Sequence, residues 1–212
     1  MEYIVLIVVL LFSIIIHEVA HGFVAYKRGD PTAKMLGRLT LNPIPHIDLF
    51  GSIIFPAILL LAGTMVESKF VFGWAKPVPI NMLNLKNPKK DMILVSLAGV
   101  TANFLLAVIA GIIMFFIRNF FYDVASMVSV YKILYFVVCI NVVLMVFNLI
   151  PIPPLDGSRV LIFLLPKELA IKYAKIERYG FIIILALMVT NVLQIIIGPI
   201  ASLLIRLLSG SV

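Results

Sequence analysis

The feature that most constrains this chain is an apolar segment near its start that contains three ionisable side chains. Residues 3–16 carry no charged side chain. His17, Glu18 and His21 come next, and apolar residues then resume. An apolar stretch of this length predicts a membrane-spanning helix, in which ionisable groups are costly and are usually retained for a function. We therefore expect these three side chains to belong to a site.

The spacing of the two histidines predicts a shared metal ion. His17 and His21 are four residues apart, a rotation of about 400° on an α-helix, so both imidazoles project from nearly the same face. Glu18 lies beside the first histidine, where it can polarise a water on the metal without being a ligand itself. This H-E-x-x-H pattern is typical of zinc peptidases. In the alternative interpretation the histidines pair with polar neighbours in a helix bundle, and the spacing and the glutamate are both accidental.

The composition predicts an all-α polytopic membrane protein. Hydrophobic residues make up 63% of the 212 residues and charged residues only 13%. The mean hydropathy is +1.17, which is not typical of a soluble domain of this size. The length favours a single domain, residues 1–212. The basic residues cluster in the connections without interleaved aromatics, so the expected partner is the lipid bilayer and not nucleic acid. The single cysteine, Cys139, excludes a disulfide framework and a cysteine metal cluster.

Four apolar segments are predicted to cross the membrane, and we expect four to six transmembrane helices in all. Between the first two lie a strand-like stretch at 36–41, where apolar and polar residues alternate, and an apolar segment at 49–66 that glycine and proline interrupt. The last segment exceeds one span, and Gly198–Pro199 is expected to divide it. The predicted spans are residues 3–26, 92–117, 131–150 and 179–208.

A catalytic zinc needs a third protein ligand, and Asp156 is the best candidate. It follows three prolines within four positions. Such a run cannot continue a helix, so the backbone before Asp156 must be irregular and must border protein or a water-filled cavity. His46 and Asp48 are alternative ligands, although their proline-rich surroundings favour a role in a loop.

Two amides also lie within the apolar spans. Asn103 is four residues after Gly99 in the second predicted span, and Asn148 is near the end of the third. An amide at membrane depth needs hydrogen-bond partners. Each amide could therefore bind substrate or serve packing, and both roles remain open.

The requirement that three ligands meet at one depth predicts the topology. The first and third spans must end on the same side, so residues 27–91 must also begin and end there. Residues 49–66 are then predicted to form a re-entrant or interfacial hairpin. The connections on the metal side carry fourteen Lys or Arg, against two around the connection between the second and third spans. The positive-inside rule therefore places the metal toward the cytoplasm.

With these residues located, the chain resembles the site-2 protease family of intramembrane zinc metalloproteases. The matching motifs are His17-Glu18-x-x-His21, Gly99-x-x-x-Asn103, and Asn148-x-x-Pro151 followed by Asp156-Gly157. The resemblance implies one Zn²⁺ per chain, with His17, His21 and Asp156 as ligands and Glu18 as the catalytic residue. It also implies cleavage of membrane-anchored proteins in or near their transmembrane segments, and we expect a prokaryotic plasma membrane. The chain looks like a short form, without the peptide-binding and nucleotide-sensing domains of larger members.

The competing interpretation is a metal or proton transporter that uses the same His, Glu and Asp cluster as a relay. A transporter predicts polar residues along a continuous path, whereas here they gather at one depth. For a protease, the strand-like residues 36–41 would offer an edge to which an extended substrate could add.

Overall fold

The computed structural model describes residues 2–48, 51, 54, 76–120 and 124–210, which form helices and loops with no strand among them. Four helices contain stretches long and apolar enough to cross a bilayer. These candidate spans are Tyr3–Lys27 within α1 (Glu2–Lys27), Pro88–Phe120 (α4), Met127–Leu149 within α5 (Val124–Leu149), and Val192–Ser209 (α9). The protein is an integral membrane protein, as its composition predicts.

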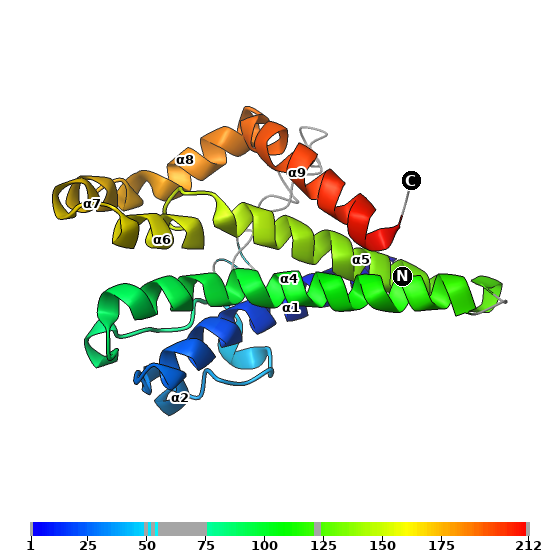
Figure 1. The fold of residues 1–212 in the computed structure, drawn as a ribbon, viewed down its shortest axis with the longest axis horizontal. Coiled ribbons are helices and arrows are strands. Elements are labelled where there is room, and N and C mark those ends of the chain that lie inside the picture. Colours follow the sequence, from blue (N-terminus) through cyan, green and yellow to red (C-terminus); the bar gives the residue numbers. More distant parts are fainter. Residues whose placement is uncertain (1, 49–50, 52–53, 55–75, 121–123, 211–212) are drawn as a thin grey trace.

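Helices α4 and α5 run side by side through the centre of the bundle, with α1 on one side and α9 folded back over α5 (Figure 1). The 33 residues of α4 extend about 50 Å at 1.5 Å per residue, which exceeds the roughly 30 Å of hydrocarbon in a bilayer. Helix α4 therefore continues beyond the predicted span 92–117 at both ends, where charged residues prolong it outside the lipid. Helix α5 begins before the predicted span 131–150, at Val124, and ends at Leu149. The buried core between α4, α5, α8 and α9 includes Ala107, Met114, Val138, Val142, Ile184 and Ile197.

The end of α1 is tied to the start of α4. The backbone N–H of Lys86 donates to the carbonyl of Arg28 at 3.1 Å, and the guanidinium of Arg28 lies 3.7 Å from the buried carboxylate of Asp91. The connection between them contains the short helices α2 (Thr32–Met35), η1 (Ile44–His46) and η3 (Met82–Asn84). The last turns of α1 and the first turns of α4 therefore lie at the same end of the bundle.

The strand predicted for residues 36–41 is wrong, since turns and bends occupy this stretch. Gly37 adopts a left-handed φ of +65° that turns the chain. Arg38 then points inward, where its guanidinium donates to the carbonyls of Pro45 and, at 2.6 Å, of Lys76. The alternation of apolar and polar residues here belongs to this folded loop and not to a β-strand. The hairpin predicted for 49–66 lies outside the described residues, apart from positions 51 and 54.

The segment predicted as one last span, 179–208, consists of two helices, α8 (Glu177–Val189) and α9. They are divided at Thr190–Asn191 and not at Gly198–Pro199, because Asn191 takes a left-handed conformation with φ 58° that asparagine tolerates. Pro199 is accommodated inside α9. Helices α6 (Asp156–Leu164) and α7 (Lys167–Ala174) precede them at the end of the molecule where α5 finishes (Figure 1).

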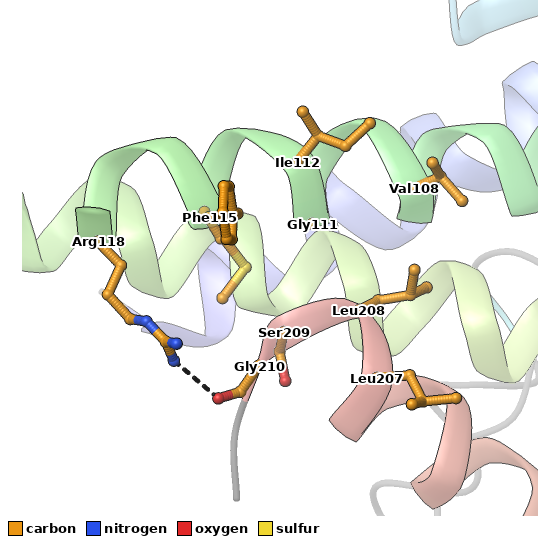
Figure 2. A pocket seen from close by; sticks show the side chains of 10 residues that line it. Val108, Gly111, Ile112, Phe115, Arg118, Leu207, Leu208, Ser209 and Gly210 are labelled. Carbon is orange, nitrogen blue, oxygen red and sulfur yellow. Dashed lines mark hydrogen bonds between the residues drawn. The ribbon is translucent and has the colours of Figure 1, made fainter. Parts of the chain in front are cut away.

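The far end of α9 packs closely on α4. A Cβ at Gly111 would lie only 2.6 Å from the backbone oxygen of Leu208, so glycine permits this contact. Arg118 donates to the carbonyl of Gly210 at 2.8 Å, beside a largely apolar cavity of about 240 Å³ (Figure 2). This contact closes the bundle at the end opposite α7.

Candidate metal centre

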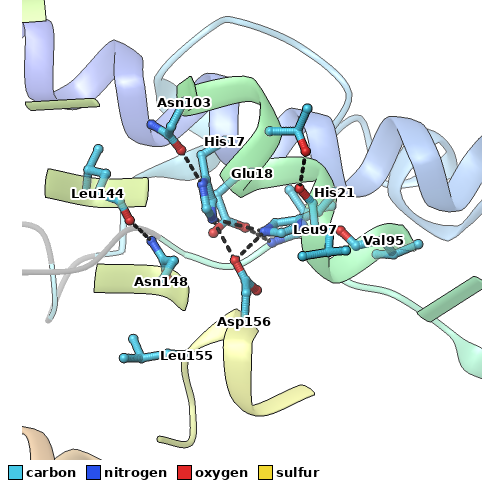
Figure 3. Close-up of polar contacts among 12 residues, drawn as sticks. His17, Glu18, His21, Val95, Leu97, Asn103, Leu144, Asn148, Leu155 and Asp156 are labelled. Atoms are coloured by element: carbon cyan, nitrogen blue, oxygen red, sulfur yellow. Dashed lines mark hydrogen bonds and ion pairs between the residues drawn. The ribbon is translucent and has the colours of Figure 1, made fainter. Parts of the chain in front are cut away.

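Three potential metal ligands meet where α1 faces the start of α6. The Nε2 atoms of His17 and His21 lie 3.0 Å apart, and they lie 3.0 and 3.1 Å from Oδ2 of Asp156. All three side chains are buried, and they point toward one another (Figure 3). The helical spacing of the histidines thus brings their two Nε2 atoms together, as predicted. Asp156 is the third member of the group.

Gly99 lets α4 approach the two histidines. A Cβ at this position would lie 2.5 Å from the ring of His17 and 2.6 Å from Nε2 of His21. No real side chain tolerates such distances, so any larger residue would displace both rings. The glycine of the Gly99-x-x-x-Asn103 motif is therefore required for the close packing of the site.

Two further glycines hold the proline-rich turn that presents Asp156. A Cβ at Gly157 would lie 2.2 Å from the backbone oxygen of Leu149 at the end of α5. One at Gly180 on α8 would lie 2.0 Å from the backbone oxygen of Pro153. The turn is therefore packed between α5 and α8 with no space on either side. This confinement fixes where the carboxylate of Asp156 can lie.

The donor atoms suit a cation. Nδ1 of His21 lies 2.6 Å from the backbone oxygen of Val95, which can only accept, so Nδ1 carries the proton of the neutral ring. Its Nε2 then presents a lone pair toward the centre of the group. Nδ1 of His17 in turn contacts Oδ1 of Asn103 at 2.5 Å. Two imidazole nitrogens and a carboxylate oxygen are a ligand set typical of catalytic zinc, which leaves a fourth position open.

The charge of Asp156 fits the same role. Burial alone would raise the pKa of this carboxyl. Without an ion, protonated Nε2 atoms of the two imidazoles donate hydrogen bonds to it and attract its charge, and they hold its pKa below the ordinary value. The carboxyl is therefore ionised near neutral pH, which is the form that binds a metal.

Glu18 lies beside the group but is not part of it. Its carboxylate borders a cavity of about 380 Å³ that the three candidate ligands also line. Oε2 of Glu18 accepts a hydrogen bond from the backbone N–H of Val78 at 2.8 Å. Residues 76–80, which have no regular secondary structure, thus pass next to the glutamate, and Pro77, Val78 and Ile80 line the cavity.

The remaining predicted residues fall into two groups. Asn103 contacts His17, and Asn148 lines the cavity while its amide donates to the carbonyl of Leu144 at 2.9 Å (Figure 3). His46 and Asp48 do not join the metal group among the described residues. Nε2 of His46 contacts the carbonyl of Thr40 at 2.9 Å instead, so this histidine is a buried part of the loop.

Sequence reasoning missed Asn141, Arg38 and Val78. Asn141 is fully buried and donates its amide to the hydroxyl of Ser13 at 2.9 Å. It lies seven residues before Asn148, two turns of helix, inside an apolar run. Its spacing from Asn148 on the same predicted span was the sequence signal that could have revealed Asn141.

A helical membrane bundle that brings together two histidines, an aspartate and a neighbouring glutamate defines a membrane-embedded zinc metalloprotease. The chain belongs to Peptidase family M50, the site-2 protease family, whose model matches residues 5–191. The resemblance seen in the sequence is thereby confirmed. No solved structure gives a significant match to the chain.

Curated relatives carry consistent names. The Bacillus subtilis (strain 168) protein named "Putative zinc metalloprotease YwhC" is 40% identical over 92% of this chain and 84% of its own length. "Putative zinc metalloprotease Rip2" of Mycolicibacterium smegmatis is 30% identical over 87% of this chain and 66% of its own length. "Zinc metalloprotease MJ0392" of Methanocaldococcus jannaschii is 27% identical over 77% of this chain and 35% of its own length.

Proposed function

We propose that this zinc metalloprotease hydrolyses peptide bonds in or near the transmembrane segments of membrane-anchored proteins, as a single domain over residues 1–212. The observation that carries the proposal is the location of the cavity. It opens beside His17, Glu18 and His21, within a segment apolar enough to span the bilayer. A substrate that reaches these residues must itself be able to enter the membrane.

His17, His21 and Asp156 would hold the ion in the proposed mechanism. When bound, zinc supplies Lewis-acid chemistry, which polarises the scissile carbonyl and lowers the pKa of water. Glu18 would act as the general base that takes the proton of the attacking water, and it would then donate this proton to the leaving amine. One residue along a helix turns a side chain by about 100°, which explains why Glu18 faces the cavity beside the ligand group.

The cavity also suits an unwound apolar peptide. Its walls combine apolar side chains with a few polar groups. A helical peptide bond is shielded by its own hydrogen bonds, so the substrate must become extended before it can be cut. Since residues 36–41 are not a strand, the edge proposed from the sequence for binding such a substrate is abandoned.

We further propose that the site faces the cytoplasm of a prokaryotic cell. The ligands lie toward the end of α1 that carries Lys27 and Arg28, and Arg159 borders the cavity. The joined ends of α1 and α4 support the expectation that residues 27–91 return to the side where they began. A re-entrant or interfacial hairpin at 49–66 satisfies this topology.

Glu18→Gln tests the function, because it keeps the size of the side chain and removes the base. The variant should bind zinc like the wild type and lose cleavage of a model transmembrane substrate in proteoliposomes by about 10²–10⁴-fold. Uncut substrates should accumulate in membranes of cells that express the variant, as seen by quantitative proteomics. Zinc flux into vesicles that depends on Glu18, with no substrate cut by the wild type, would instead establish the transporter.

A further inference from the structure

A continuous row of buried polar side chains leads away from the metal group through the bundle. It starts at His17, continues through Asn103 on α4 and Asn141 on α5, and ends at Ser13 on α1. The side chain of Asn103 and that of Asn141 are fully buried, and Ser13 is 3% exposed. Three helices are therefore joined by hydrogen bonds at the depth of the site.

The direction of these hydrogen bonds is set at the Asn141 end. Nδ2 of Asn141 lies 2.9 Å from the backbone oxygen of Val137 and 2.9 Å from Oγ of Ser13. A carbonyl can only accept, so the amide nitrogen of Asn141 must face Val137. Its Oδ1 is thereby turned toward α4, where it can only accept.

The orientation is passed on to Asn103. Oδ1 of Asn141 lies 2.8 Å from the amide nitrogen of Asn103, which donates to it. The other end of the Asn103 amide, its Oδ1, consequently faces Nδ1 of His17. An amide oxygen accepts, so Nδ1 of His17 must carry a proton. In the neutral ring, which is the form that binds a metal, Nε2 then presents its lone pair to the metal group.

We propose that Asn141 is a positioning residue for zinc binding, which acts through Asn103 to fix the tautomer of His17. Without Asn141, the Asn103 amide can rotate by 180° and place its nitrogen against His17. That ring would then carry its proton on Nε2 and could not bind the ion without a costly rearrangement. The inference rests on the proposed role of His17 as a zinc ligand.

Nitrogen NMR of metal-free protein labelled with ¹⁵N-histidine tests the tautomer directly, because the chain has three histidines. In the wild type, Nδ1 of His17 should carry a proton, with or without a second proton on Nε2, which faces the Asp156 carboxylate at 3.0 Å. His46 serves as an internal reference of the opposite form, because its Nε2 faces the carbonyl of Thr40. Asn141→Leu should shift His17 toward the Nε2-protonated form and leave His46 unchanged. Wild-type His17 without a proton on Nδ1 would overturn the proposal.

Zinc affinity, measured by competition with a chromogenic chelator, gives the second readout. Asn141→Leu should weaken binding by about 10–100-fold, the range typical of residues that orient a metal ligand. Ser13→Ala should have an effect below about threefold, since Val137 still orients the amide. Asn119→Leu is the matched control, because the Asn119 amide also donates to a carbonyl four residues earlier, at 2.7 Å, on an exposed part of α4. It should leave the affinity unchanged.

A double-mutant cycle separates this role from general destabilisation. If Asn141 acts through Asn103, then Asn141→Leu should change zinc affinity by less than about twofold in a protein that already carries Asn103→Leu. Equal losses with and without Asn103 would contradict the proposal. His17→Ala distinguishes an error in the proposed ligand set from an error in the role proposed for Asn141. If this variant keeps zinc, the proposed ligand set is wrong, whereas if it loses zinc while Asn141→Leu binds normally, only the role of Asn141 is wrong.

Discussion

The backbone N–H of Val78 donates to Oε2 of Glu18 at 2.8 Å, across 60 positions of sequence. Val78 is flanked by Pro77 and Pro79, which have no N–H of their own. This short segment therefore offers the glutamate a single donor from a stiff backbone. The carboxylate that we propose as the general base is held by the chain that passes over it.

Arg38 supports the segment that holds Glu18. Its guanidinium, which is 6% exposed, donates to the carbonyl of Lys76 at 2.6 Å and to that of Pro77 at 3.3 Å. Arg38→Lys keeps the charge and loses the forked geometry. We expect cleavage of a model substrate to fall about tenfold, equivalent to one charge-assisted hydrogen bond of about 1.5 kcal/mol, while zinc content is unchanged. Lys34→Ala, on the exposed side of the same loop, should cleave normally. Loss of zinc in Arg38→Lys would show that the arginine maintains the metal group itself.

Addition of a single methyl group at Gly99 should be enough to weaken zinc binding. In Gly99→Ala the new methyl must displace both histidine rings, so we expect zinc binding to weaken more than about tenfold. The purified variant can be compared with the wild type by metal analysis and chelator competition. Gly198→Ala is a matched control in α9, where a Cβ would make only an ordinary contact with Gln194, at 3.8 Å. Normal zinc affinity in Gly99→Ala would mean that α4 can move away without cost.

Asp156→Ala distinguishes the proposed third ligand from the alternatives in the loop. Removal of the carboxylate leaves two ligands, so we expect loss of stoichiometric zinc and of cleavage. The control is Asp48→Ala, which removes an acceptor of a hydrogen bond from the backbone N–H of Gly51, at 2.6 Å. Zinc should remain in the control. The opposite pattern would make Asp48 the ligand.

Asp30 should make stability depend on pH below the neutral range. Burial alone would raise the pKa of its carboxyl, but hydrogen bonds from Thr32, Asn84 and Asn81 outweigh it and hold the pKa below the ordinary value of 3.8. The stabilisation is therefore complete above the pKa of the unfolded chain and is lost as the pH falls through the lower folded pKa. Thermal unfolding in detergent should show a smaller acid-induced loss below about pH 4 for Asp30→Asn than for the wild type. If the unfolding temperature falls equally steeply with decreasing pH in both proteins, Asp30 makes no such contribution.

The sequence predicts the metal group well and its supports poorly, for a physical reason. His17 and His21 belong together through the period of one helix, and the proline run before Asp156 restricts what the backbone can do. The partners Val78 and Asn141 contact the site through long-range packing, which no local period reveals. Residues 36–41 show the reverse problem, since their alternation imitates a strand while a buried arginine and a left-handed glycine determine a turn. The role of Asn148 and the hairpin at 49–66 stay predictions.

His17 and Asp156 meet although they are 139 positions apart. An ion bound by both would act as a cross-link that closes about two thirds of the chain into a loop. Such a closure lowers the entropy of the unfolded chain, and binding energy then becomes folding energy. The same ion would thus hold the first helix to the C-terminal helices, and chelation should make the turn before Asp156 more accessible to added proteases as well as abolish activity.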